Sequence, residues 1–297
     1  HRRHRVDVVY TVFLVYIVNT VYTVDNVDMG PAGAEQDGGF NMGAVWVLTT
    51  PKGGAGKTTL ALVLAGELAR LGKTVEIIDA DANAPVITWT MTAANAGRTI
   101  GGPDDAIGSA ARIRVTRAAQ EPAAFRGQIT MAQARADFTI IDTEGTNNPL
   151  STFAIAAANL VIVPMQASPE DGRHALRAVE FATEVGAMRG AAIPTVVVLT
   201  RTGVVRDSTQ RSVERTMAEQ AAARHLVLCP VHLAERGAYR AILLEGCTLD
   251  ALAIVHPVTG LETAQQNAAA LLRALAGCYR DILARGQGET STPETAA

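Results

Sequence analysis

The sequence predicts an α/β fold, namely a doubly wound, mostly parallel sheet with helices on both faces. Short apolar runs alternate with helical patterns through most of residues 44–285, and strands that alternate with helices form βα units. The runs are continuously apolar, as in parallel strands buried on both faces. Several of these runs end in Asp or Thr. In open parallel sheets, ligands bind beyond the carboxyl ends of the strands, so the ends of these runs are where we expect function.

Length and composition allow one large domain with a full core. The chain has 297 residues, of which 48% are hydrophobic and 19% charged, and a formal net charge of -3. This charge gives no global reason to expect nucleic acid, so any DNA contact needs a local basic patch. The cysteines Cys229, Cys247 and Cys278 lie far apart in the sequence. They argue against a zinc site or a disulfide framework and favour a reducing, cytoplasmic location.

We expect one folded domain, residues 42–286, between two segments that lie outside it. Residues 1–41 carry a basic start, an uncharged stretch from Val8 to Val24 and a Gly-rich linker. We interpret them as a leader that is not part of the fold. A short membrane contact and an added β element are the alternatives. Residues 287–297, rich in Ser, Thr, Glu and Pro, are predicted to be a disordered tail.

Residues 51–59, Pro-Lys-Gly-Gly-Ala-Gly-Lys-Thr-Thr, lie between a predicted strand at 44–50 and a helical pattern that ends near Gly72. Strand, Gly-rich loop and helix are the context of a phosphate-binding loop. The glycines let backbone N–H groups point at a polyphosphate, and the helix N-terminus adds partial positive charge. The predicted binding residues are Gly53, Gly54, Ala55, Gly56, Lys57, Thr58 and Thr59. Lys57 is expected to neutralise the β- and γ-phosphates, and the Thr58 hydroxyl to bind Mg²⁺.

Two later strands end in carboxylates. The strand at 74–79 leads into Asp79 and Asp81, and the strand at 138–142 ends in Asp142, a Walker B pattern. Asp142 is expected to hold Mg²⁺ through water, and Asp79 is a second candidate for the same ion. Asp81 is placed to orient an attacking water. The alternative for Asp79 and Asp81 is a pair of solvated loop aspartates.

The remaining expected elements complete the alternation. Edge strand, helix, strand and helix are expected at 112–117, 122–136, 159–166 and from Pro169 onward. A strong strand at 195–200, a weaker one at 226–231 and a long helix at 262–285 come next. Residues 96–111 show only a weak pattern.

The phosphate loop carries a second lysine, Lys52, and has Pro51 where the ordinary motif has Gly. Lys-Gly-Gly-x-Gly-Lys-Thr-Thr resembles the deviant Walker A box of the ParA/MinD ATPases. The resemblance implies ATP and Mg²⁺ as cofactors, slow Mg²⁺-dependent hydrolysis to ADP and phosphate, and a homodimer that forms on ATP binding. It assigns Lys52 to the partner's nucleotide and ties Asp81 to hydrolysis, so Lys52, Lys57 and Asp81 are the expected catalytic residues. Arg201 falls where relatives contact adenine, with a plain surface arginine as the alternative.

Three further stretches resemble the VirC-type accessory ATPases of conjugal and T-DNA transfer. They are Asp-Thr-Glu-Gly-Thr at 142–146, Arg-Gly-Ala-Tyr-Arg at 236–240 and Glu-Gly-Cys-Thr-Leu at 245–249. This branch implies non-specific or origin-region DNA and a DNA-bound adaptor or relaxosome protein as partners, with a nucleoid or pole association. Glu144 is expected to be a switch-loop or dimer contact rather than a base. The tail lacks a basic amphipathic helix, so membrane binding is not expected.

Two functions remain open from the residues. One is a dimerising switch ATPase that positions or segregates DNA, in plasmid partition or in transfer. The other is a DNA-binding scaffold whose contact with DNA is controlled by bound nucleotide. Hydrolysis then serves only for release. A set of arginines late in the chain favours DNA contact, although a solvated helix face also explains the spacing of Arg211 and Arg215. The set is Arg201, Arg206, Arg211, Arg215, Arg236, Arg240, Arg273, Arg280 and Arg285. A metabolic synthetase of the same fold is a third possibility.

Overall fold

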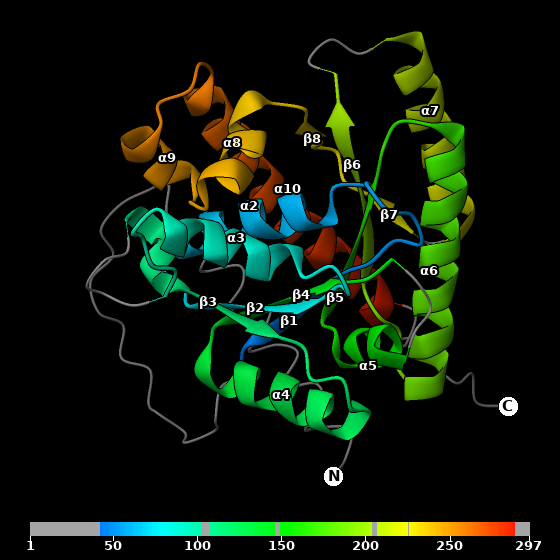
Figure 1. Ribbon diagram of the computed structural model, residues 1–297. Helices are drawn as coiled ribbons and strands as arrows, with labels where there is room; N and C mark the ends of the chain where they lie inside the picture. Colours follow the sequence, from blue (N-terminus) through cyan, green and yellow to red (C-terminus); the bar gives the residue numbers. More distant parts are fainter. Residues whose placement is uncertain (1–41, 102–106, 146–148, 204–206, 225, 289–297) are drawn as a thin grey trace, which may run out of the picture.

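The computed structural model describes residues 42–101, 107–145, 149–203, 207–224 and 226–288 (Figure 1). The predicted leader therefore lies outside the described residues, as do Thr146, Arg206 and most of the predicted tail. No helix in the described ranges is both long enough and apolar enough to cross a lipid bilayer.

The strands form one parallel sheet, as predicted, in the order β3-β2-β4-β1-β5-β6-β7, with β8 paired to β6 off this path. Their bounds are β1 Ala44–Leu48, β2 Val75–Ala80, β3 Ile113–Arg117, β4 Phe138–Thr143, β5 Leu160–Met165, β6 Thr195–Thr202, β7 Val227–Leu228 and β8 Leu233–Ala234. The weaker strand expected at 226–231 is reduced to the two residues of β7. The sheet confirms the doubly wound α/β class.

Helices cover both faces of the sheet (Figure 1). Their bounds are α2 Lys57–Arg70, α3 Pro85–Asn95, η1 Gly108–Arg112 (a 3₁₀ helix), α4 Pro122–Arg135, α5 Pro149–Ala157, α6 Pro169–Arg189, α7 Ser208–Arg224, α8 Gly237–Glu245, α9 Leu249–Val255 and α10 Leu261–Gly288. The elements α3, α5, α8, α9 and β8 were not predicted separately from the sequence. The terminal helix also runs to Gly288, past the predicted start of the tail.

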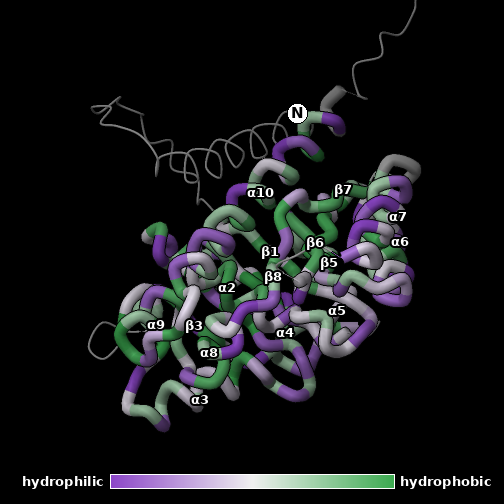
Figure 2. The backbone as a smooth tube through the Cα atoms, turned by 90° about the horizontal axis from the view of Figure 1, so that it is seen from above, coloured by the Kyte–Doolittle hydropathy of each residue, from purple (hydrophilic) through white to green (hydrophobic). Residues whose placement is uncertain are grey.

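The alternation of side chains along the strands divides the core into two layers. In β1, Trp46 and Leu48 join the layer under α2, α3, α8, α9 and α10, whereas Val45 and Val47 join the layer over α4, α5, α6 and α7. Figure 2 shows the hydrophobic strands enclosed by helices of mixed hydropathy. A central strand such as β1 is covered by helices on both faces, and its continuous apolar run agrees with that position.

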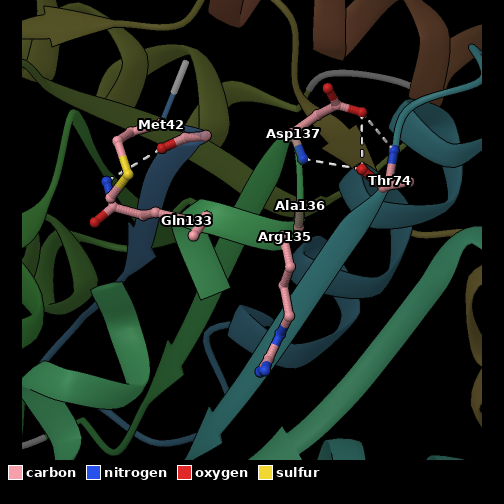
Figure 3. A pocket seen from close by; sticks show the side chains of 8 residues that line it. Met42, Thr74, Gln133, Arg135, Ala136 and Asp137 are labelled. Atoms are coloured by element: carbon pink, nitrogen blue, oxygen red, sulfur yellow. Dashed lines mark hydrogen bonds between the residues drawn. The ribbon is translucent and has the colours of Figure 1, made fainter. Parts of the chain in front are cut away.

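The amino ends of the strands meet at the opposite edge from the phosphate loop. Met42, Thr74, Gln133 and Asp137 line a small hollow there (Figure 3). The Asp137 carboxylate accepts hydrogen bonds from Thr74 N at 2.8 Å and Thr74 Oγ1 at 2.9 Å, and Asp137 N donates to Thr74 Oγ1 at 3.0 Å. These bonds join the segments that lead into β2 and β4, and thereby fix the relative register of the two strands.

That register brings the site together at the other edge. Leu48 of β1 and Asp79 of β2 each lie beside Asp142 of β4. Three strands therefore end at the same level, and the loop after β1 emerges close to the two aspartate-bearing ends.

Candidate functional site

The loop after β1 has the conformation of an open anion cradle. Gly54 has φ 82° and Gly56 φ 86°, in the left-handed region that glycine adopts without strain. A Cβ built on Gly53 or Gly54 would meet no atom of a described residue within 4 Å, so these residues leave the outer side of the loop open. Gly56 is the N-cap residue of α2 and provides no side-chain cap, and the first turn of α2 carries no acidic residue. The first N–H groups of the helix are thus available to an anion.

Neighbouring strand ends hold the back of this loop in place. The Thr200 hydroxyl, on β6, donates to the carbonyl of Ala55 at 2.6 Å. The Gln166 amide, just after β5, donates to the carbonyl of Gly54 at 3.1 Å. These two carbonyl groups are hydrogen-bonded to side chains at the strand ends. The opposite, open side of the loop is therefore left to backbone N–H donors.

Lys57 and Thr58 meet Asp142 at the base of the cradle. Lys57 is only 7% exposed, although it opens a helix at the surface. The Thr58 hydroxyl donates to Asp142 Oδ2 at 2.7 Å. Burial raises the pKa of Asp142 to about 7, while the Thr58 hydrogen bond and the Lys57 charge lower it, and Asp79 and Asp81 raise it further. The carboxylate is thus held in a dry position beside a buried cation.

This arrangement fits a magnesium ion bound together with a nucleotide. Asp142 Oδ1 is buried and has no hydrogen-bond partner among the described residues, so it can accept from a donor such as a metal-bound water. No group of three or more His, Cys, Asp or Glu side chains within the described ranges is placed to hold a metal. Mg²⁺ keeps several waters and binds with phosphates and one or two carboxylates, so Thr58 and Asp142 suit it without further protein ligands.

Asp79 lies beside Asp142 but is used differently. Its Oδ2 accepts hydrogen bonds at 2.9 Å from the backbone N–H groups of Val86 and Ile87, in the first turn of α3. Its Oδ1 accepts from Asp81 N at 3.3 Å and lies 3.4 Å from Arg117 Nη1. Burial is the main cause that raises the pKa of Asp79, and these hydrogen bonds oppose the rise. The geometry gives Asp79 the role of a helix cap, and the metal contact expected from sequence stays a prediction.

Asp81, in contrast, stands half-buried in the loop between β2 and α3. Its Oδ1 accepts from Asn83 N at 2.9 Å and from the Asn83 side chain at 3.2 Å. The carbonyl of Asp81 accepts from Arg117, at the end of β3. Arg117 was not among the site residues predicted from the sequence. The available signal was its position as the last residue of a predicted strand.

Lys52 is bound within its own chain. Its Nζ lies 2.7 Å from Asp171 Oδ1 and 3.8 Å from Glu170 Oε2, both at the start of α6. The hydrogen bond to Asp171 is the largest cause that raises the pKa of Lys52. This pair was not predicted from the sequence, because the carboxylates lie more than a hundred residues after Lys52.

The segment after β4 runs close over the phosphate loop. A Cβ on Gly145 would lie 2.4 Å from the carbonyl oxygen of Thr50 and 3.3 Å from Lys57 Nζ. Only glycine permits this approach without displacement of the backbone. Glu144, one residue earlier, is half-buried at the same edge. Gly145 is a site residue that was not predicted as such from the sequence.

Arg201 is exposed on β6 and has φ 51°. It lies at an irregularity in the β6–β8 pairing, between Thr200 and Thr202. Non-glycine residues rarely adopt this conformation, and such strain concentrates at functional positions. The expected adenine contact of Arg201 stays a prediction, and so does the nucleotide contact of Thr59, which is half-buried in the first turn of α2.

The late arginines do not form one cluster. Arg211 and Arg215 are exposed on α7, one turn apart. Arg240 is paired with Glu235 at 2.6 Å, on the segment that leads into α8. The arginines of α10 belong to a different helix again. The α7 pair has the one-sided spacing from which DNA contact was inferred.

The fold and the phosphate loop place this chain among the P-loop nucleotide-binding proteins, and Lys52 ahead of the glycines places it in their ParA/MinD class of ATPases. Residues 45–277 match the model of the VirC1 protein family. The chain therefore belongs to the VirC1 family, the branch that its sequence resembles.

Individual proteins agree with this assignment. VirC1 of Rhizobium radiobacter is 33% identical over 195 residues, which are 66% of this chain and 78% of that protein. ParA of Rhizobium radiobacter is 27% identical over 241 residues, 80% of this chain and 99% of that protein. The solved structure of Cyanothece McdA in complex with ATP superposes with a TM-score of 0.58 at 18% identity, over 80% of this chain and 97% of that one. This last similarity shows a shared fold.

Proposed function

We propose that this protein is an ATP-dependent switch that dimerises when it binds ATP and Mg²⁺, hydrolyses ATP slowly, and so positions or segregates DNA in plasmid partition or in conjugal or T-DNA transfer. The observation that carries the proposal is the half-buried Thr58 hydroxyl bonded at 2.7 Å to the buried Asp142, beside a loop with left-handed glycines. The VirC1 and ParA relatives support the class of ATPase, and the ATP complex of McdA supports the nucleotide.

The residues divide the work of hydrolysis. Lys57 and the first N–H groups of α2 hold the β- and γ-phosphates, and their charge stabilises the transferring phosphoryl group. Thr58 and Asp142 would hold Mg²⁺, which would neutralise charge on the phosphate oxygens. Asp81 orients the water that attacks the γ-phosphorus. The bond from that phosphorus to the β–γ bridging oxygen breaks, ADP leaves, and the water's oxygen remains on the phosphate product.

Lys52 links nucleotide binding to assembly. Its ammonium, bound to Asp171 and Glu170 in the single chain, is exposed enough to leave them. A second copy of the chain would place its bound triphosphate near the start of α6. That triphosphate offers the Lys52 ammonium a more highly charged partner than these carboxylates. The dimer then depends on bound ATP, and hydrolysis removes the anion that holds it.

The nucleotide part of the proposal is tested by calorimetry and turnover on two variants. Lys57→Ala is expected to lose ATP binding, because it leaves the phosphates without their buried cation. Asp81→Ala is expected to bind ATP and Mg²⁺ as before and to hydrolyse it about tenfold or more slowly. Lys73→Ala, which changes the one lysine outside the loop, is the matched control. Normal binding and turnover in both site variants would refute the proposal.

A second candidate is a scaffold in which nucleotide only gates DNA binding. The exposed Arg211–Arg215 pair on α7 favours it. DNA affinity with ATP present should fall steeply between about 50 and 200 mM salt, and less steeply in a variant with both arginines changed to Ala. Arg114→Ala, on β3, is the control. A salt-independent affinity would exclude this candidate. A DNA-bound adaptor or relaxosome protein is the partner that we propose for either form.

A further inference from the structure

The loop between β2 and α3 presents its carbonyl oxygens to a single side chain. Arg117, the last residue of β3, donates from Nη1 to the carbonyl of Asp81 and to that of Asp79 at 3.3 Å. Its Nη2 donates to the carbonyl of Ala82 at 3.3 Å. Nη1 also lies 3.4 Å from Asp79 Oδ1. One guanidinium therefore bridges the end of the strand and the first two residues of the loop, and its planar fork of donors suits such a set.

The loop needs this support, because its own conformation is strained. Ala84 has φ 49°, and among the residues that the structure describes only Ala84 and Arg201 adopt positive φ without being glycine. The loop closes on itself through Ala84 N, which donates to the carbonyl of Asp81 at 2.9 Å. Strained backbone persists only where the surroundings over-determine it. Arg117 supplies part of that constraint, in addition to the Asp79 helix cap.

Arg117 is itself fixed. It lies beside Asp79 in the β2–β3 register, and the Gln128 side chain, on α4, donates to its carbonyl at 2.8 Å. Arg114, three residues earlier on the same strand, is exposed, and its side chain makes no hydrogen bond or ion pair to any described residue. The two arginines share a strand and a charge but differ in contacts, so Arg114 is a matched control.

We propose that Arg117 is a positioning residue for ATP hydrolysis: it holds the Asp79–Ala82 backbone so that the Asp81 carboxylate meets the attacking water. This inference rests on the proposed function. The hydrogen bonds of the Arg117 side chain go to the loop after β2 and not to the phosphate loop, so it acts on turnover rather than on nucleotide affinity. A displacement of about 1 Å in a catalytic group costs up to about a hundredfold in rate.

The test compares Arg117→Gln, Arg117→Lys and Arg114→Gln in the full chain. Arg117→Gln is expected to lower kcat about tenfold or more, with the Kd for ATP and Mg²⁺ changed less than about twofold. Amide hydrogen exchange should accelerate over residues 81–84 in this variant and stay unchanged in Arg114→Gln. Arg117→Lys keeps the charge but not the planar fork of donors. Its turnover should lie between those of Arg117→Gln and the parent, and its amide exchange should remain faster than in the parent.

A double variant separates positioning from a general structural role. In an Asp81→Ala background, Arg117→Gln should cause no further loss of turnover, because the group that it positions is gone. Equal losses in both backgrounds, or a fall in ATP affinity that matches the fall in kcat, would overturn the assignment. Unchanged kcat in Arg117→Gln beside an active parent overturns this inference alone. A parent chain that neither binds nor hydrolyses ATP overturns the proposed function, and the role of Arg117 with it.

Discussion

Asp79 and Asp142 occupy equivalent places on neighbouring strands and do different work. They are paired in the β2–β4 register, and both side chains are fully buried. Within the described ranges, Asp142 accepts a hydrogen bond from the Thr58 hydroxyl and keeps its other oxygen without a hydrogen-bond partner. Asp79 accepts backbone N–H bonds on both oxygens. Residue type, register and burial therefore leave the role of a strand-end carboxylate undecided.

The difference comes from the segment after each strand. After β2, α3 starts at Pro85, and its N-cap residue Ala84 has no side chain that can cap a helix. The free N–H groups in the first turn of α3 therefore donate to Asp79. After β4, the chain passes over the phosphate loop through Gly145. The Asp142 carboxylate accepts from the Thr58 hydroxyl instead of from a helix start. The Asp79 carboxylate is bonded to the start of a helix, whereas Asp142 keeps one oxygen without a hydrogen-bond partner among the described residues. Four predictions test this contrast, from the largest expected effect to the smallest.

Asp142→Asn is expected to slow hydrolysis about a hundredfold, because the amide keeps the shape of the carboxylate but not the charge that Mg²⁺ requires. The free energy of unfolding should not fall, since the change removes a charge from a dry site. Steady-state turnover and chemical denaturation of the same preparation measure the two effects. Loss of stability without loss of turnover would make Asp142 a structural residue like Asp79.

Asp79→Ala is expected to reduce the free energy of unfolding by about 1–3 kcal/mol, because it leaves the N–H groups of Val86 and Ile87 without an acceptor. The Mg²⁺ concentration for half-maximal ATP binding should stay within about twofold of the parent value, since Asp79 has no oxygen to spare for the ion. Denaturation and a Mg²⁺ titration provide the measurements. A large shift of the titration with normal stability would restore Asp79 as a metal contact and remove the contrast.

The pH dependence of stability offers a third comparison. Burial holds the pKa of Asp142 at about 7 in the folded chain, well above its usual value. The folded chain thus keeps a proton that the unfolded chain releases near pH 4, and stability falls as pH rises between these values, by up to about 1.4 kcal/mol per pH unit. Unfolding of the nucleotide-free chain from about pH 5 to pH 8, with Asp142→Asn alongside, isolates this contribution. An identical slope in both proteins contradicts it.

Ala84→Gly should have the smallest effect. Glycine relieves the left-handed strain at φ 49°, but it also gives the unfolded chain more freedom, so the free energy of unfolding should change by less than about 1 kcal/mol. Faster exchange of the Asn83 and Ala84 amides is expected to accompany this near-neutral result. Destabilisation well beyond that size would show that the Ala84 methyl group packs, and that strain does not describe the loop after β2.

Much of this protein could be predicted from local patterns. The apolar runs indicated the parallel sheet, and Gly54, Gly56, Lys57 and Thr58 indicated the cradle, because a phosphate loop needs consecutive residues between one strand and one helix. Asp142 was found from the run that precedes it, and its bond to Thr58 agrees with the expected metal role without testing it. The second lysine and the stretch from Asp142 to Thr146 indicated the family to which the matched residues 45–277 assign the chain.

Contacts between distant segments could not be predicted in this way. Lys52 meets Asp171 and Glu170, and Arg117 meets the loop after β2, only because the order of strands in the sheet brings their ends to one edge. The roles of Asp79 and Asp142 were likewise separated by their hydrogen-bond donors in space and not by their neighbours in sequence. Periodicity and motifs report a residue's local environment, whereas hydrogen-bond partners across a sheet depend on topology and register, and these are decided when the whole chain packs.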